Sequence, residues 1–219
     1  MLIPSQLAAM KLGVRRDWRP QPFAPAMGSA PAYAPAYSRI VSTPRVAGRN
    51  DQLADCFPTA CANAVQTLIY RAGITIALSD AVAVNAYAGM TGYTPLHPAS
   101  DHGTNPDTGF AWWQENALAG YRLRELTQIA PTAEGEIRAA IGARGGVLLC
   151  VELSTANQNQ RVWLPDGAAG SWGGHAVWAD GYDGAITNVT SWGQDFYIDR
   201  SYFEAGFVVG VYALDLVRA

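Results

Sequence analysis

The stretch GRNDQLADCFPTACANAVQTLIY, residues 48–70, predicts a helix that begins beside a cysteine. The spacing of its apolar residues indicates a helix over residues 57–72, which Gly73 ends. Pro58 falls in the first turn, where a backbone N–H has no intrahelical partner, so a proline is tolerated there. The pattern therefore places the Cys56 thiol at the amino end of a helix, where the helix dipole lowers a thiol pKa.

A second stretch, GSWGGHAVWADGYDG at residues 170–184, contains His175, one of three histidines in the chain. His175 follows two glycines at the head of a predicted strand, where another backbone can approach closely. Either residue alone is more often structural than catalytic. Together, a thiol at a helix start and an imidazole at a strand start are the residue types of a nucleophile–base pair. Cys61 and Cys150 are instead predicted to be small buried hydrophobes.

Composition excludes several classes of protein. The 219 residues are enough for one domain with a sizeable core, and the net charge of -3 gives no sign of a nucleic-acid-binding face. Three cysteines without a CxxC pair favour neither a disulfide framework nor a structural zinc site. We expect no signal peptide and no membrane span, because no apolar run fits either.

The chain divides into three parts by composition. Residues 1–47 are rich in proline and alanine and predict an extended segment, either a flexible linker or an arm that lies on a partner. Residues 48–145 indicate helices and residues 146–219 indicate strands, an order typical of the α+β class. The aromatic anchors of such an arm would be Trp18, Phe23, Tyr33 and Tyr37.

Within the middle part, the pattern predicts three more helices, at residues 79–87, 111–120 and 131–144. A long Gly/Pro/Asp-rich loop is expected over residues 90–109. That loop holds the other two histidines and two aspartates, namely His97, Asp101, His102 and Asp107. Their spacing fits no metal-binding motif, so we expect a solvated loop without a metal ion.

The segments NDQLADCFPTACANA, GSWGGHAVWADGYD and VTSWG, in this order, resemble the papain-like cysteine peptidase fold. They are closer to the divergent versions in bacteriophage and bacterial genomes than to papain itself, and the similarity covers residues 48–215. The resemblance implies an α+β domain over residues 48–219, with the nucleophile helix packed on a mainly antiparallel sheet. The segment 1–47 would be an extended N-terminal arm outside this domain.

The resemblance implies a role for each matching residue. Cys56 would be the nucleophile and His175 the general base. The family's oxyanion donor is a glutamine six residues before the cysteine, a place that Asn50 holds here, while Gln52 has the residue type at a different spacing. Either amide would act with the backbone N–H of Cys56.

The family orients its histidine with an asparagine, and Thr190 stands in that place here. Its hydroxyl would accept the ring N–H, and Asn188 would point to the same face of the strand. Trp192 would shield the histidine from water, or it would be an ordinary core residue. With Asn188 and Trp192, the glycines Gly173 and Gly174 would line the substrate cleft.

These assignments lead to a thiol-dependent hydrolase of peptide or amide bonds, with a peptide or protein substrate, no cofactor and no metal. The bacteriophage resemblance suggests a virion-associated peptidase located in the virion or the bacterial cytoplasm. An alternative is a catalytically weak or inactive module that serves as a structural component of a phage tail, neck or capsid, anchored to other virion proteins by its N-terminal arm. An acyl transferase or deamidase that uses the same two residues is a third option.

Overall fold

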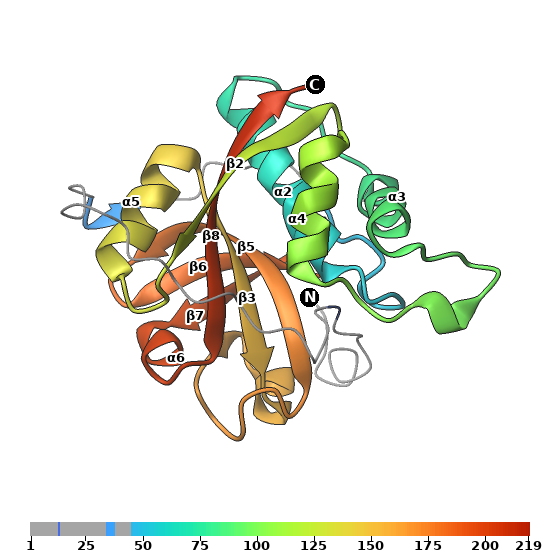
Figure 1. Cartoon of the computed structure of the whole chain (residues 1–219). Helices are drawn as coiled ribbons and strands as arrows, with labels where there is room; N and C mark the ends of the chain where they lie inside the picture. The colour runs from blue at the N-terminus through green and yellow to red at the C-terminus, as the bar shows by residue number, and fades with distance from the viewer. Residues whose placement is uncertain (1–12, 14–33, 38–44) are drawn as a thin grey trace.

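A computed structural model describes residues 13, 34–37 and 45–219 of the chain (Figure 1). It has the α+β class expected, with helices on both sides of one sheet. The helices are α2 (Cys56–Arg71), α3 (Asp80–Thr91), α4 (Pro106–Glu115), α5 (Glu134–Arg144) and α6 (Arg200–Glu204), with short 3₁₀ turns at Pro98–Ser100 and Thr155–Asn159. The strands are β1 (Ala36–Tyr37), β2 (Tyr121–Ile129), β3 (Val147–Leu153), β4 (Val162–Trp163), β5 (Gly173–Asp183), β6 (Ile186–Ser191), β7 (Gln194–Asp199) and β8 (Val208–Arg218).

The strands form one eight-stranded sheet in the order β2-β8-β3-β5-β6-β7-β4, with β1 paired to β5. Every pairing is antiparallel except that of β4 with β7. The long strand β5 lies at the centre of this order, between β3 and β6, and it is buried along almost its whole length. The predicted mainly antiparallel sheet is therefore confirmed.

Two apolar cores lie on opposite faces of the sheet, and β3 contributes to both. Leu148 and Cys150 belong to the α2 core, which lies between the sheet and helices α2, α3 and α4. Val147, Leu149 and Val151 belong to the α5 core, which lies between the sheet and α5. Because side chains alternate along a strand, a strand covered on both faces becomes a continuous apolar run, as the β3 sequence is.

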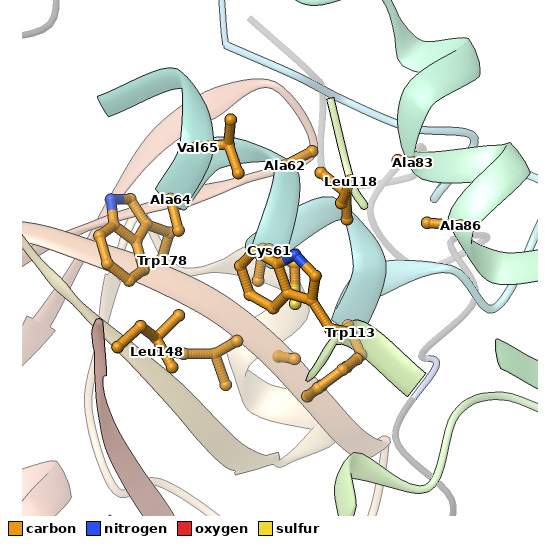
Figure 2. Close-up of a cluster of buried hydrophobic side chains, with 14 of the residues drawn as sticks. Cys61, Ala62, Ala64, Val65, Ala83, Ala86, Trp113, Leu118, Leu148 and Trp178 are labelled. Atoms are coloured by element: carbon orange, nitrogen blue, oxygen red, sulfur yellow. The ribbon is translucent and has the colours of Figure 1, made fainter. Parts of the chain in front are cut away.

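Helix α2 is nearly surrounded by protein, and Figure 2 shows how its small side chains meet the sheet. The rings of Trp113 and Trp178 and the side chain of Leu148 gather around Cys61 and Ala64. Small residues on α2 let the helix approach the sheet closely enough for these large side chains to fill the space between them.

A hydrogen bond fixes how α2 sits on β5. The indole Nε1–H of Trp178 donates to the Thr67 hydroxyl at 3.0 Å, within the α2 core. Since an indole N–H without a partner is costly to bury, this bond favours one register of the helix over the strand.

The chain that leads into α2 is held by side chains of α2 and α3. Asn63 of α2 exchanges two hydrogen bonds with the backbone of Val46, from the Val46 N–H to Oδ1 at 3.1 Å and from Nδ2 to the Val46 carbonyl at 2.9 Å. Asp80 at the start of α3 accepts the backbone N–H groups of Ala47 and Gly48. These contacts fix the direction in which the chain enters α2.

The helix predicted over residues 111–120 has the wrong bounds. It is α4, which ends at Glu115 and begins at Pro106, because Asn105 caps it by accepting the backbone N–H of Asp107 at 2.9 Å. A capping asparagine followed by proline is a helix-start signal that lay inside the expected loop.

The chain then reverses through Ala119 and Gly120, both with positive φ, and enters a strand that was not predicted. That strand, β2, has many exposed charged residues between its few buried ones, so its apolar pattern is weak. The hydrogen-bonded neighbour β8 makes it a strand.

Of the four aromatic residues expected as anchors of an arm, only Tyr37 lies within the described residues. Its ring stacks on Tyr182 at 6.2 Å, and the Tyr182 hydroxyl donates to the Ala34 carbonyl at 3.0 Å. Residues 36–37 add a short strand to β5. Tyr37 is thus anchored on this chain's own sheet, whereas Trp18, Phe23 and Tyr33 lie outside the described residues. Within the described part, no helix combines the length and apolar character needed to cross a bilayer.

The packing of α2 on the sheet gives the first testable prediction. Leu148 is fully buried in the α2 core, so Leu148→Ala should lower the free energy of unfolding by about 2–5 kcal/mol. Leu164, which is 39% exposed, is the matched control, and its replacement by alanine should cost about 1 kcal/mol or less. Urea denaturation followed by tryptophan fluorescence measures both. Equal losses would contradict the assignment of Leu148 to a tightly packed core.

Candidate active site

The thiol of Cys56 lies where the amino end of α2 meets β5. Cys56 is the first residue of α2 and is fully buried. Its Sγ accepts the backbone N–H of Ala176 at 3.3 Å, and Ala176 directly follows His175 in β5. The structure therefore brings the Cys56 sulfur to the backbone that follows His175, although the two residues are far apart in the sequence.

The imidazole of His175 is held on the α5-core side of β5 by aromatic rings. Trp192 stacks on it with ring centroids 4.6 Å apart and planes inclined by 14°, and Trp163 meets it edge-on at 6.3 Å. Trp172 stacks on the other side of Trp192 at 5.7 Å. This stack limits the rotation of the imidazole ring and excludes water from it.

The two ring nitrogens of His175 have different environments. Nε2 lies 2.7 Å from the Ser191 hydroxyl oxygen, whereas Nδ1 is buried and has no hydrogen-bond partner among the described residues. Because Ser191 occupies Nε2, the nitrogen left to exchange a proton is Nδ1.

The turn between β6 and β7 places Trp192 over the histidine. Ser191 pairs with Gln194, so the loop consists of Trp192 and Gly193 alone, with φ values of 49° and 67°. Two consecutive positive φ values are typical of a two-residue hairpin turn, and a large side chain adopts them at a cost. Because Trp192 lies in this turn and not in a strand, its side chain does not follow the strand alternation, and its ring stacks on the imidazole ring of His175.

The expectation for the orienting group needs correction. Thr190 pairs with Trp178 across the two strands, so its side chain faces the α2 core as the Trp178 side chain does. His175 lies three residues before Trp178 in β5, so its side chain points to the opposite face of the sheet. Asn188 shares the face of Thr190 in β6. The hydroxyl that reaches the imidazole belongs to Ser191 instead. A one-residue shift along a strand reverses the face, which the sequence pattern did not reveal.

The predicted oxyanion side chains lie near the start of α2 but are engaged elsewhere. The Asn50 amide is buried and donates to the Ala47 carbonyl at 3.2 Å, while its Oδ1 has no hydrogen-bond partner among the residues that the structure describes. Gln52 is exposed and bonds to its neighbours Arg49 and Asp51. Neither has a hydrogen bond to Cys56 or His175, so the oxyanion roles of both side chains stay predictions.

The residues expected to line a substrate cleft are largely enclosed. Gly173 and Gly174 pair with Leu153 and Glu152 of β3, and Gly173 has a φ of 151°, which favours glycine. Trp192 is buried against His175. The role of these residues in binding a substrate stays a prediction.

Burial dominates the electrostatics of the two central groups. It raises the pKa of the Cys56 thiol to about 12, although backbone N–H groups of Ala176, Gly13 and Phe57 act in the opposite direction. It lowers the pKa of His175 to about 3. Both shifts favour the neutral form of each side chain in this enclosed arrangement.

One residue of the N-terminal segment contacts the thiol. Gly13 is buried beside the Cys56 sulfur, where its backbone N–H favours the thiolate, and its carbonyl accepts the backbone N–H of Thr104 at 2.7 Å. Gly13 was not predicted as part of the site, since a single glycine in a segment rich in proline and alanine carries no signal of its own.

Two acids near the thiol were also missed as parts of the site. Asp55 is fully buried just before Cys56, and its Oδ2 accepts the Arg49 backbone N–H at 2.9 Å. Asp101, expected in a solvated loop, accepts the backbone N–H of Ala54 at 2.9 Å and the hydroxyl of Tyr87 at 2.8 Å. The loop after α3 thus folds back onto the start of α2.

The histidines of that loop, His97 and His102, are exposed. Within the described residues, no three His, Cys, Asp or Glu side chains come together as metal ligands would.

Burial raises the pKa of Asp55 from 3.8 to about 7, which gives a pH-dependent prediction. Between these values the folded chain binds a proton that the unfolded chain has lost, so this residue makes the protein less stable as pH rises. Asp55→Asn cannot ionise, so its gain in unfolding free energy over the wild type should grow from pH 4 to pH 8. Urea midpoints across this range measure it, with the exposed Asp51→Asn as control. A gain that does not change with pH would contradict the buried carboxyl.

Three solved structures have a similar fold over nearly the whole length of this chain. No family model and no curated protein matches the sequence. Xylellain, a cysteine protease from Xylella fastidiosa, has a TM-score of 0.68 at 14% identity, covering 95% of this chain and 99% of its own. Digestive procathepsin L 3 of Tenebrio molitor has a TM-score of 0.66 at 15% identity, covering 96% and 78%. A recombinant stem bromelain precursor has a TM-score of 0.65 at 14% identity, covering 97% and 80%.

At these identities the similarity establishes the fold rather than the chemistry. Together with the order of the helices and strands and the meeting of α2 with β5, it shows that this chain has the papain-like cysteine protease fold.

Proposed function

We propose that this chain is a thiol-dependent hydrolase of peptide or amide bonds, with Cys56 as nucleophile and His175 as proton carrier. The observation that supports it most is the position of the Cys56 sulfur, 3.3 Å from the backbone nitrogen that follows His175. The ring Nδ1 of His175 has no hydrogen-bond partner within the described part of the chain. The fold shared with several cysteine proteases agrees with this chemistry.

The reaction follows from the groups present. His175 takes the thiol proton on Nδ1, and the sulfur of Cys56 attacks the carbonyl carbon of the substrate. The C–N bond then breaks, and the imidazolium returns its proton to the leaving amine. Water, deprotonated by the same imidazole, cleaves the thioester and restores the thiol. The oxyanion formed in each addition would lie at the amino end of α2, where the helix dipole and the backbone N–H of Cys56 would stabilise negative charge.

Ser191 would hold the imidazole in the required orientation. The Ser191 hydroxyl oxygen lies 2.7 Å from Nε2. In the Nε2–H tautomer, whose Nδ1 is free to take a proton, the hydroxyl accepts a hydrogen bond from Nε2–H. In the Nδ1–H tautomer it donates to Nε2 instead. The first case is the one that catalysis needs. A hydroxyl thus replaces the asparagine that related sequences use.

Opening of the site would precede catalysis. Desolvation is the largest cause of both shifted pKa values, so admission of water would lower the thiol pKa and raise the imidazole pKa towards their ordinary values. The two groups would then exchange a proton near neutral pH.

A second candidate function is a papain-like module without hydrolytic activity, in a phage particle. The observation that favours it is the complete burial of both Cys56 and His175 in this arrangement. The bacteriophage setting, the virion partners and the location stay predictions from the sequence resemblance.

Hydrolysis separates the two candidates. The full chain, incubated with a quenched-fluorescent peptide library, should release fluorescence, and Cys56→Ala or His175→Ala should lower the rate by roughly 10³-fold or more. Cys61→Ala is the matched control, because Cys61 is buried in the same helix without contact to His175, and it should keep the wild-type rate. No turnover by the wild type, or turnover that survives Cys56→Ala, would refute the hydrolase and leave the module.

The role of Ser191 as a positioning residue has its own test. Ser191→Ala should lower kcat about tenfold with little change in KM, because about 1.4 kcal/mol of orientation is lost from the transition state. Ser191→Thr should restore much of the rate, and Thr190→Val, on the opposite face, should leave it unchanged. The pH at which kcat is half-maximal should also shift in Ser191→Ala. If Thr190→Val has the larger effect, the assignment of Ser191 is wrong.

A further inference from the structure

We propose that Asp101 is a positioning residue for the nucleophile. Its carboxylate, held by Tyr87, fixes the backbone just before Cys56 and so sets where the thiol and the Cys56 backbone N–H meet a substrate. The inference rests on the proposed function for the word substrate, whereas the fixing of the backbone does not depend on it. Residues 47–54, which lead into α2, are called the entry segment below.

The amino end of α2 has no cap of its own. Asp55 stands at the N-cap position, yet within the described part of the chain its side chain makes no capping hydrogen bond to the helix. A helix start without a capping side chain leaves backbone N–H groups unsatisfied and frays over its first residues. Cys56 is the first residue of α2, so its thiol needs support from outside the helix to keep one position.

The entry segment is held at both ends by carboxylates from other parts of the chain. Asp80 accepts the first two backbone N–H groups of the segment at 2.8 and 3.0 Å. Asp101 accepts the N–H of Ala54, the last residue of the segment, at 2.9 Å. Of these two supports, Asp101 is the nearer to the nucleophile, because Ala54 lies two residues before Cys56.

The Tyr87 hydroxyl holds Asp101 in place. Tyr87 is fully buried, and its hydroxyl donates at 2.8 Å to Oδ1 of Asp101, the same oxygen that accepts the Ala54 N–H. The hydroxyl also accepts the backbone N–H of Gly103 at 3.0 Å. A continuous chain of hydrogen bonds therefore runs from α3 to the backbone before the thiol, and the carboxylate cannot turn without breaking it.

Both supports depend on one helix. Asp80 and Tyr87 are seven residues apart in α3, so they lie on the same side of the helix, about 10 Å apart along its axis. Between them, Ala83 and Ala86 are buried in the α2 core, which Figure 2 shows beside α2. Because α3 is packed into this core, it holds the two ends of the entry segment at a fixed spacing.

The contribution of Asp101 is geometric rather than electrostatic. A negative charge close to a thiol disfavours the thiolate, which is the opposite of what a nucleophile needs. Asp55, directly before Cys56, has its pKa raised by burial first and by the charges of Asp101 and Asp80 in addition. An amide oxygen at position 101 would accept the same two hydrogen bonds without the charge, so asparagine should replace this aspartate.

Hydrogen–deuterium exchange of the full chain tests the fixing of the backbone without any hydrolysis. Asp101→Ala should speed exchange in the peptide that covers residues 53–60 by about tenfold or more, because a buried N–H loses its acceptor, while peptides from β3 and β8 keep wild-type rates. Ser100→Ala is the matched control, since the Ser100 hydroxyl ties the same loop to the carbonyls of Thr94 and His97 and not to the entry segment. Unchanged exchange over residues 53–60 in Asp101→Ala, or equally faster exchange throughout the chain, would overturn the proposal.

Two milder variants keep the test valid if Asp101→Ala does not fold. Asp101→Asn should exchange as the wild type does over residues 53–60. Tyr87→Phe keeps the ring and removes the hydroxyl, so exchange there should be roughly threefold faster or more. Loosening by Asp101→Asn, or none by Tyr87→Phe, would overturn the proposal.

Hydrolysis of the quenched-fluorescent peptides tests the positioning itself. Asp101→Ala should lower kcat by about tenfold or more with KM unchanged, because a displaced nucleophile weakens the transition state and not the binding of substrate. Asp101→Asn should restore kcat, and Ser100→Ala should keep the wild-type value. A change in KM alone, or an equal loss of kcat in Ser100→Ala, would reduce Asp101 to a structural residue of its loop and overturn the proposal.

The two readouts separate this proposal from the hydrolase. A wild type that hydrolyses nothing, with residues 53–60 loosened in Asp101→Ala, would refute the hydrolase and keep Asp101 as the support of the α2 start. Hydrolysis that Asp101→Ala leaves unchanged would refute the positioning role and keep the hydrolase.

Discussion

The contact of the amino end of α2 with β5 is the constraint on which the rest of the site depends. It joins the Cys56 sulfur to the backbone beside His175, and the hydrogen bond between Trp178 and Thr67 holds the helix on the same face of the same strand. Small side chains on α2 make this approach possible. The α2 core on one face and the aromatic stack on the other then bury the two reactive groups from opposite sides of the same strand.

Burial in this protein works against ionisation, and the chain offers little to offset it. The thiol and the imidazole are both neutral when enclosed, and Asp55 next to the thiol carries a raised pKa as well. The backbone N–H groups around the sulfur favour the thiolate, but desolvation outweighs them. The enclosed arrangement therefore disfavours the charged form of both groups.

The sequence predicted the fold class, the nucleophile helix and the strand of the histidine because each has a strong local signal. The helix α2 begins one residue before the predicted start and ends at Arg71, two residues before the glycine expected to end it. The buried strand β3 was visible as a continuous apolar run. The sequence did not predict β2, since an exposed charged strand has little pattern until a neighbour pairs with it.

For the site, the sequence by itself determined which residue types are available: a thiol at a helix start, an imidazole after two glycines, and a hydroxyl pair before Trp192. Only the tertiary structure decided which of these meet. It selected Ser191 over Thr190, because the face of a strand depends on register, and it brought Asp101, Tyr87 and Gly13 to the thiol from distant segments. The physical reason is that periodicity and capping act over a few residues, whereas contacts across a sheet or between loops depend on how the whole chain packs.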